Sequence, residues 1–77
     1  MKKSVILIED YQLIRETYID IINSTASYEV VGDFESCEDA LPKLKALLPD
    51  IIFLDITLPG MNGIQGIHEI KQVVPNV

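Results

Sequence analysis

The stretch VILIED, residues 5–10, decides the fold, because four consecutive apolar residues run directly into two carboxylates. A short apolar run without alternation is typical of a strand that helices cover on both faces, as in parallel sheets. A second such run, IIFL at residues 51–54, leads directly into Asp55. A third run at residues 28–31 is more mixed and suits a strand near a sheet edge. These runs predict three strands of one sheet.

Amphipathic segments separate the predicted strands. Between the first two strands, apolar residues recur at helical spacing, and Arg15 and Glu16 fall mainly on the other side. The apolar set is Leu13, Ile14, Tyr18, Ile21 and Ile22. An apolar stripe over residues 40–48 predicts a second helix, and residues 64–73 predict a third. Strands that alternate with helices indicate right-handed crossovers and an α/β fold with a parallel sheet.

Pro42 complicates the second predicted helix. Residues 36–39 resemble a capping box, and a helix capped by Ser36 would hold Pro42 in its interior. Proline in a helix interior costs about 3 kcal/mol. A helix that begins at Asp39 would place Pro42 in the first turn, where no backbone N–H is needed. We therefore expect either a late start or a kink.

Composition and charge exclude several classes of protein. The net charge of −6, with no basic cluster beyond Lys2 and Lys3, argues against nucleic-acid contact within these residues. The first apolar run is shorter than the roughly 7–15 residues of a signal peptide, and no run approaches the roughly 20 of a membrane span. The single cysteine, Cys37, fits a reducing compartment. We expect one cytoplasmic domain without membrane contact.

Carboxylates follow two of the predicted strands. If strands 5–8 and 51–54 are neighbours, Glu9, Asp10 and Asp55 meet at the carboxyl edge, where parallel sheets bind ligands. Mg²⁺ would relieve the repulsion among these charges, and a carboxylate can act as a nucleophile toward a phosphoryl group. The alternative is that the three acids simply face solvent at strand ends, as most charged residues do. Spacing alone supports the two interpretations about equally.

Three segments together closely resemble the receiver domains of bacterial two-component response regulators: residues 6–10, residues 49–55 and the loop LPGMNG at residues 58–63. The resemblance covers essentially the whole chain. It implies a flavodoxin-like, three-layer α/β/α fold. Residues 29–33 also look like receivers that precede helix-turn-helix DNA-binding domains, which implies an output such as transcription control.

The same resemblance assigns roles to individual residues. Asp55 would be the phosphoacceptor, served by the phosphohistidine of a sensor histidine kinase. Asp10 would bind Mg²⁺ directly, Glu9 would help through a water molecule, and Thr57 would offer its backbone carbonyl. Pro59 and Gly60 would shape the loop, and Gly63 would let it turn into the third helix.

The chain departs from the family pattern in two ways. Its acidic pair is Glu9-Asp10, where the family more often has two aspartates. Residues 1–77 also contain three strand–helix units, whereas the family has five, so we expect an incomplete receiver domain. The absent units would carry the Ser or Thr, the Lys and the aromatic switch residue of the family. The strand at residues 51–54 would then be an exposed apolar edge, which predicts a homodimer or an element swap through it.

Two other functions remain open. A magnesium-dependent phosphatase with an aspartate nucleophile needs a second acid two residues later, and Thr57 occupies that position. This disfavours a turnover enzyme and favours a signalling module that catalyses its own phosphorylation. The remaining alternative is a pseudo-receiver or interaction fragment that never turns over phosphate.

Overall fold

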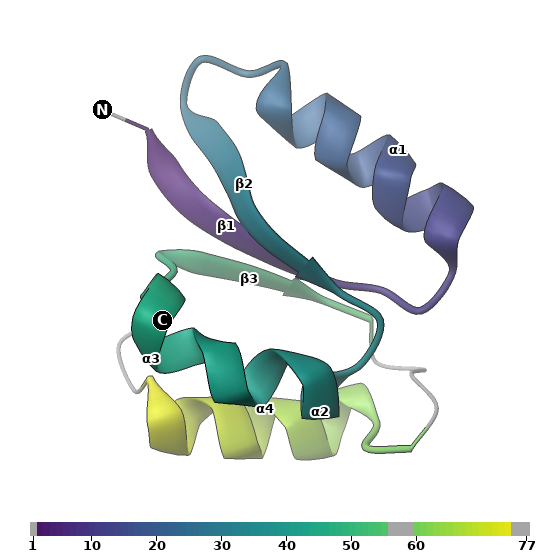
Figure 1. Cartoon of the computed structure of the whole chain (residues 1–77), viewed down its shortest axis with the longest axis vertical. Coiled ribbons are helices and arrows are strands. Elements are labelled where there is room, and N and C mark those ends of the chain that lie inside the picture. Colours follow the sequence, from purple (N-terminus) through teal and green to yellow (C-terminus); the bar gives the residue numbers. More distant parts are fainter. Residues whose placement is uncertain (1, 56–59, 75–77) are drawn as a thin grey trace.

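Three parallel strands form the sheet in the computed structural model, which describes residues 2–55 and 60–74. They are β1 (Lys3–Ile8), β2 (Tyr28–Phe34) and β3 (Ile51–Leu54). The order across the sheet is β2-β1-β3, so β1 lies in the centre (Figure 1). Both pairings are parallel. The predicted parallel sheet and the edge position of the second strand are confirmed.

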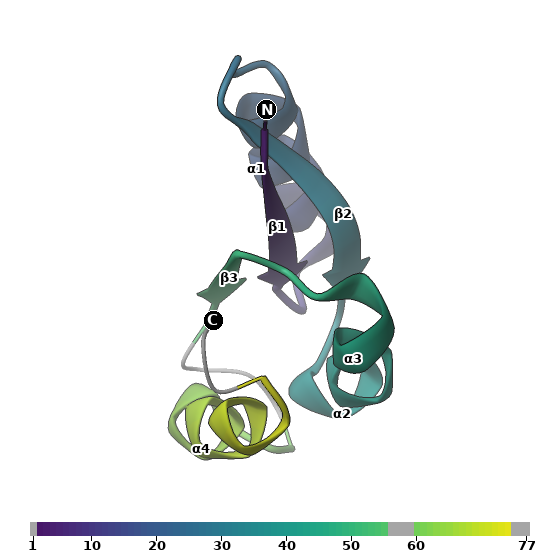
Figure 2. The same cartoon turned by 90° about the vertical axis from the view of Figure 1, so that its left-hand side faces the viewer.

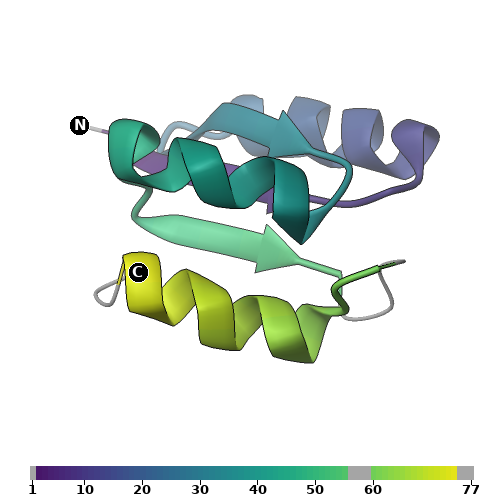
Figure 3. The ribbon, with the colours of Figure 1, turned by 60° about the horizontal axis from the view of Figure 1, so that its bottom comes forward.

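Helices lie on both faces of this sheet (Figures 1 and 2). The helical elements are α1 (Gln12–Asn23), α2 (Cys37–Ala40), η1 (Leu41–Lys43), α3 (Leu44–Leu47) and α4 (Gly63–Val73). Helix α1 covers one face, while α4 and the segment from α2 to α3 lie side by side on the other (Figure 3). The arrangement is the expected three-layer α/β/α fold.

The core explains why the first strand has no alternation of apolar and polar residues. Residues 5–8 of β1 are all buried, because the strand has helices above and below it. Ile6 and Ile8 belong to the main core cluster, whose other members come from the second layer of helices: Cys37, Ala40, Leu44 and Ile70. Leu7 instead contributes to the α1 side of the sheet.

The segment that contains Pro42 is broken into three short elements. The Ser36 hydroxyl accepts a hydrogen bond from Asp39 N at 3.1 Å, so α2 begins directly after Ser36. Pro42 lies in the 3-10 turn η1, and α3 continues after it. The expected kink is confirmed and the late start at Asp39 is wrong. The tighter turn accommodates a ring that has no N–H and would crowd an α-helix.

Helix α1 packs less completely than the other layer. None of its residues is buried, and the apolar residues Leu13, Tyr18 and Ile21 are each about half exposed or more. Phe53 of the edge strand β3 is likewise 50% exposed. Within the part of the chain that the structure describes, no helix has the length and apolar character required to cross a bilayer.

Candidate phosphoacceptor and metal site

The sheet brings the three predicted acids together. Ile8 of β1 is paired with Leu54 of β3, so Glu9 and Asp55 leave the sheet side by side. The Asp55 N–H donates to the Ile8 carbonyl at 3.1 Å, which continues the pairing one step beyond β3. One carboxylate oxygen each from Glu9, Asp10 and Asp55 lies within 4.8 Å of the others. The predicted convergence of these carboxylates is confirmed.

Glu9 is the buried member of this cluster. The residue is 8% exposed, and its Oε2 atom has no hydrogen-bond partner among the described residues. Burial raises the pKa of Glu9, and the neighbouring Asp55 and then Asp10 raise it further. A buried carboxylate oxygen without a donor costs about 1–3 kcal/mol. Three converging carboxylates, one with such an oxygen, suit a hard divalent cation such as Mg²⁺.

The other acids are more accessible. Asp55 is half-buried and Asp10 is exposed, so a ligand can reach the cluster from the carboxyl edge of the sheet. Thr57, predicted to offer its carbonyl, and Pro59, predicted to shape the loop, lie outside the described residues.

The end of the loop after Asp55 is held by a residue that sequence reasoning did not single out. Glu38, in the first turn of α2, accepts a hydrogen bond from Met61 N through Oε2 at 3.2 Å. Gly60 has φ +70°, and a Cβ there would lie 2.6 Å from the same oxygen. Gly60 thus has both roles that favour glycine, a left-handed backbone and a close approach.

Helix α4 begins with a capping box that the sequence analysis also missed. The Asn62 side chain accepts from Gln65 N at 3.0 Å, and the Gln65 side chain accepts from Asn62 N at 3.3 Å. The Asn-x-x-Gln spacing could have revealed it, because Asn is a preferred N-cap and Gln at the third position completes the box. Gly63 is the first residue of this helix, as the expected turn requires.

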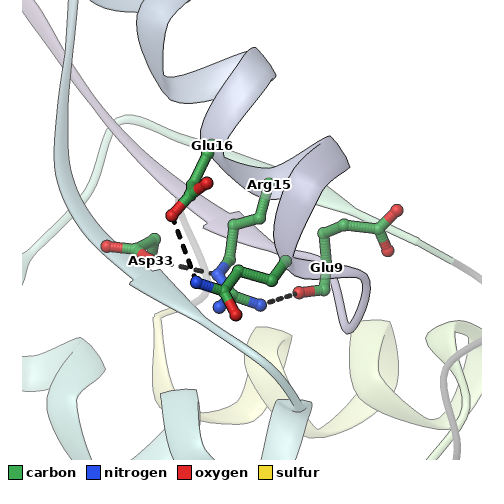
Figure 4. A network of polar contacts seen from close by, with 5 residues as sticks. Glu9, Arg15, Glu16 and Asp33 are labelled. Carbon is green, nitrogen blue, oxygen red and sulfur yellow. Dashed lines mark hydrogen bonds and ion pairs between the residues drawn. The ribbon is translucent and has the colours of Figure 1, made fainter.

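Arg15 connects α1 with the main chain at Glu9, although the helical spacing predicts that Arg15 lies on the polar side of the helix. One of its terminal nitrogens donates to the main-chain carbonyl of Glu9 at 2.8 Å, and Nε lies 3.2 Å from Asp33 Oδ2 (Figure 4). Its side chain is only 12% exposed. A separate exposed hydrogen bond joins Gln12 to Glu16 on the same helix.

An apolar groove borders the acidic cluster on the α1 side of the sheet. Its volume is about 560 Å³. Its lining consists of Leu7, Ile8, Tyr18, Ile21, Ile22, Phe53 and Leu54, together with Glu9 and Asp55. The site therefore has a polar rim at the strand ends and an apolar flank beneath α1.

Sequence comparison relates this chain to signalling proteins. A family model described as the response regulator receiver domain matches residues 5–77. Chemotaxis protein CheY of Thermotoga maritima is 43% identical over 76 residues, which cover 99% of this chain and 62% of CheY. The transcriptional regulatory protein DegU of Brevibacillus brevis is 34% identical over 76 residues, which cover 99% of this chain and 32% of DegU.

Solved structures give the same relationship. The response regulator domain of Thermotoga maritima CheB matches with a TM-score of 0.90 and 32% identity, over 97% of this chain and 56% of that chain. A LuxR-family two-component response regulator from Aurantimonas sp. SI85-9A1 matches with a TM-score of 0.87 and 30% identity, over 94% and 51% of the two chains. The chain thus spans less than two thirds of the length of these relatives.

Proposed function

The chain belongs to the response regulator receiver domain family, and from this premise we propose that Asp55 accepts a phosphoryl group in the presence of Mg²⁺. The phosphodonor is a phosphohistidine of a sensor histidine kinase, and the protein acts in the cytoplasm. Phosphorylation then controls an output such as transcription, as the similarity to DegU and to a LuxR-family regulator suggests. The protein acts as a signalling module and not as a turnover enzyme.

The buried Glu9 oxygen is the observation that carries this proposal. An acid cluster at a strand edge is common, but a carboxylate that is 8% exposed and lacks a donor at Oε2 favours a cation. Glu9 and Asp10 are the proposed ligands beside Asp55, and Thr57 is proposed to add its backbone carbonyl. Mg²⁺ suits this set because it prefers oxygen ligands and is commonly shared between carboxylates and a phosphate.

The transfer itself requires little covalent chemistry from the protein. An Asp55 carboxylate oxygen attacks phosphorus, the P–N bond to the donor histidine breaks, and the histidine nitrogen keeps the electron pair. When bound, Mg²⁺ neutralises charge on the phosphoryl oxygens and on the acid cluster. The sheet contributes positioning, since the Asp55 N–H bond to Ile8 fixes where the nucleophile emerges.

Chemical phosphorylation tests the assignment of Asp55. Incubation with Mg²⁺ and acetyl phosphate, followed by intact-mass measurement, should add one phosphoryl group to the wild type and none to Asp55→Asn. Glu29→Gln is a matched control, because Glu29 is an exposed acid paired with Ser4 near the opposite end of the sheet. An adduct that persists in Asp55→Asn would refute the assignment, and no adduct on the wild type would favour the pseudo-receiver alternative.

The phosphatase alternative makes a different prediction. Such an enzyme would release phosphate continuously from a small phosphomonoester, whereas a receiver forms at most one adduct per chain. Thr57 stands where those enzymes need a second acid, which disfavours turnover. Catalytic release of phosphate that depends on Asp55 would therefore replace the signalling proposal.

A further partner is a second copy of this chain. Strand β3 is the edge of the described sheet, and its half-exposed Phe53 offers apolar surface beside backbone groups that no other described strand pairs. Self-association through this edge, as a homodimer or by element swapping, remains part of the proposal.

A further inference from the structure

The main chain at Glu9 is held at both of its polar groups. Its N–H donates to the Phe34 carbonyl at the end of β2, at 3.0 Å. Its carbonyl accepts from a terminal nitrogen of Arg15 at 2.8 Å. The first bond continues the sheet pairing, but the second comes from a helix side chain that no sheet geometry requires (Figure 4).

The carbonyl that Arg15 holds belongs to the peptide plane between Glu9 and Asp10. Because a peptide unit is planar, fixing the direction of this carbonyl also fixes the direction in which the chain enters Asp10. Both proposed metal ligands therefore flank the plane that Arg15 holds. The bond goes to the main chain and not to a carboxylate oxygen, so this contact does not compete with a cation for its ligands.

Asp33 orients the arginine. Its Oδ2 lies 3.2 Å from Arg15 Nε, while a terminal nitrogen of the same guanidinium donates to the Glu9 carbonyl. Two nitrogens of one rigid group therefore contact Asp33 on β2 and the main chain after β1. The side chain of Arg15 is 12% exposed and that of Asp33 is 45% exposed. A planar guanidinium bonded through two of its nitrogens has little freedom to rotate, whereas a lysine ammonium has no such fixed geometry.

We propose that Arg15, oriented by Asp33, is a positioning residue that sets the places of the Glu9 and Asp10 carboxylates for a divalent cation. This inference rests on the proposed function of the acidic cluster and adds a residue from outside that cluster. The alternative is a purely structural role, in which Arg15 only holds α1 against the sheet. That alternative predicts a loss of stability without any change in the metal affinity of the folded protein.

Titration with Mn²⁺, a paramagnetic substitute for Mg²⁺, separates the two roles. Free Mn²⁺ is followed by electron paramagnetic resonance, at a temperature where circular dichroism shows each variant to be folded. We expect Arg15→Met to bind Mn²⁺ about tenfold more weakly, at the low end of the effect of losing an outer-shell partner. Arg15→Lys and Asp33→Asn should each weaken binding by a smaller factor, about threefold, because one of the two anchoring points remains.

Glu16→Gln is the matched control. Glu16 is adjacent to Arg15 on α1, but its hydrogen bond goes to Gln12. Its Mn²⁺ affinity should equal that of the wild type. Melting temperatures in EDTA record any purely structural effect of each substitution.

The outcomes distinguish this inference from the proposed function. Wild-type Mn²⁺ affinity in a folded Arg15→Met variant overturns the positioning role and leaves the metal site intact. If Arg15→Met does not fold, Arg15→Lys decides, and wild-type affinity there overturns the role equally. Failure of the wild type to bind Mn²⁺ removes the metal site itself and this inference with it.

Discussion

At the scale of single residues, the burial of the Glu9 carboxyl group carries an electrostatic cost. Its pKa lies above the ordinary 4.5, through burial first and then through Asp55 and Asp10. A carboxyl group with a higher pKa in the folded state binds more protons when folded than when unfolded. Its stabilising contribution is therefore present below about pH 4.5 and is lost as the pH rises through the folded-state pKa.

Mg²⁺ should reverse this loss, because the cation competes with the proton for the same oxygens. We expect saturating Mg²⁺ to raise the melting temperature more at about pH 7.5 than at about pH 5, because the raised pKa of Glu9 lets the proton compete better with the cation at the lower pH. Glu9→Gln should stabilise the metal-free protein at neutral pH, by on the order of 1 kcal/mol, and should diminish the Mg²⁺ effect. Glu29→Gln should change neither. A Mg²⁺ effect of equal size at both pH values would contradict this explanation.

At the scale of elements, Glu38 joins α2 to Met61, beyond the proposed phosphoacceptor Asp55. Its Oε2 accepts the Met61 N–H, and the same oxygen lies where a Cβ of residue 60 would be. Two features thus restrict residue 60 to glycine, the positive φ and the carboxylate of another element. The two costs can be separated, because only the second depends on Glu38.

Gly60→Ala should destabilise the protein by about 1–3 kcal/mol, the cost of a left-handed alanine plus that of moving the flexible Glu38 carboxylate away from its bond with Met61. Glu38→Ala alone should cost about 1 kcal/mol, the usual net value of one hydrogen bond. In the double variant there is no Glu38 carboxylate to move, so the loss should be smaller than the sum of the two single losses. Urea denaturation of the four proteins gives this coupling energy. Strict additivity would show that the backbone angle alone requires glycine.

The features that could be predicted from the sequence at this scale depend on local runs of residues and on the general geometry of parallel sheets. Apolar runs that end in Glu9 and Asp55 predict the strands and the acid cluster, because parallel strands place their carboxyl ends together. The break at Pro42 could be predicted only as one of two alternatives. The Ser36–Asp39 hydrogen bond and the burial of Cys37 favour an early start followed by a 3-10 turn.

The missed contacts have a different origin. Arg15 meets Asp33 across 18 residues of sequence, and Glu38 meets Met61 across 23. Such pairs depend on how α1 and α2 are placed against the sheet, which periodicity does not specify. A polar residue at the margin of a helix face can turn inward when a carbonyl and a carboxylate stand opposite it, as they do at Arg15.

At the scale of the whole molecule, the two faces of the sheet are covered unequally. Six buried residues unite β1 with α2, α3 and α4 on one face. On the other face, α1 has no buried residue and leaves the apolar groove of about 560 Å³ beside β3. Seventy-six residues of this chain align with 62% of the length of CheY, so CheY has further chain outside the match. This face and the β3 edge together are the surface through which we propose that residues 1–77 self-associate.

A separate polypeptide of residues 1–77 should therefore self-associate. Phe53 is 50% exposed on β3, and burying such a side chain against a second copy would contribute about 1–2 kcal/mol per chain. Phe53→Lys should shift the population toward monomer in size-exclusion chromatography with light scattering, because a charged edge resists strand pairing. Ile64→Lys is the control, since Ile64 is 72% exposed on α4. A folded monomer for the unsubstituted polypeptide would refute self-association, and equal effects of both lysines would show that general solubility, and not the β3 edge, controls the assembly.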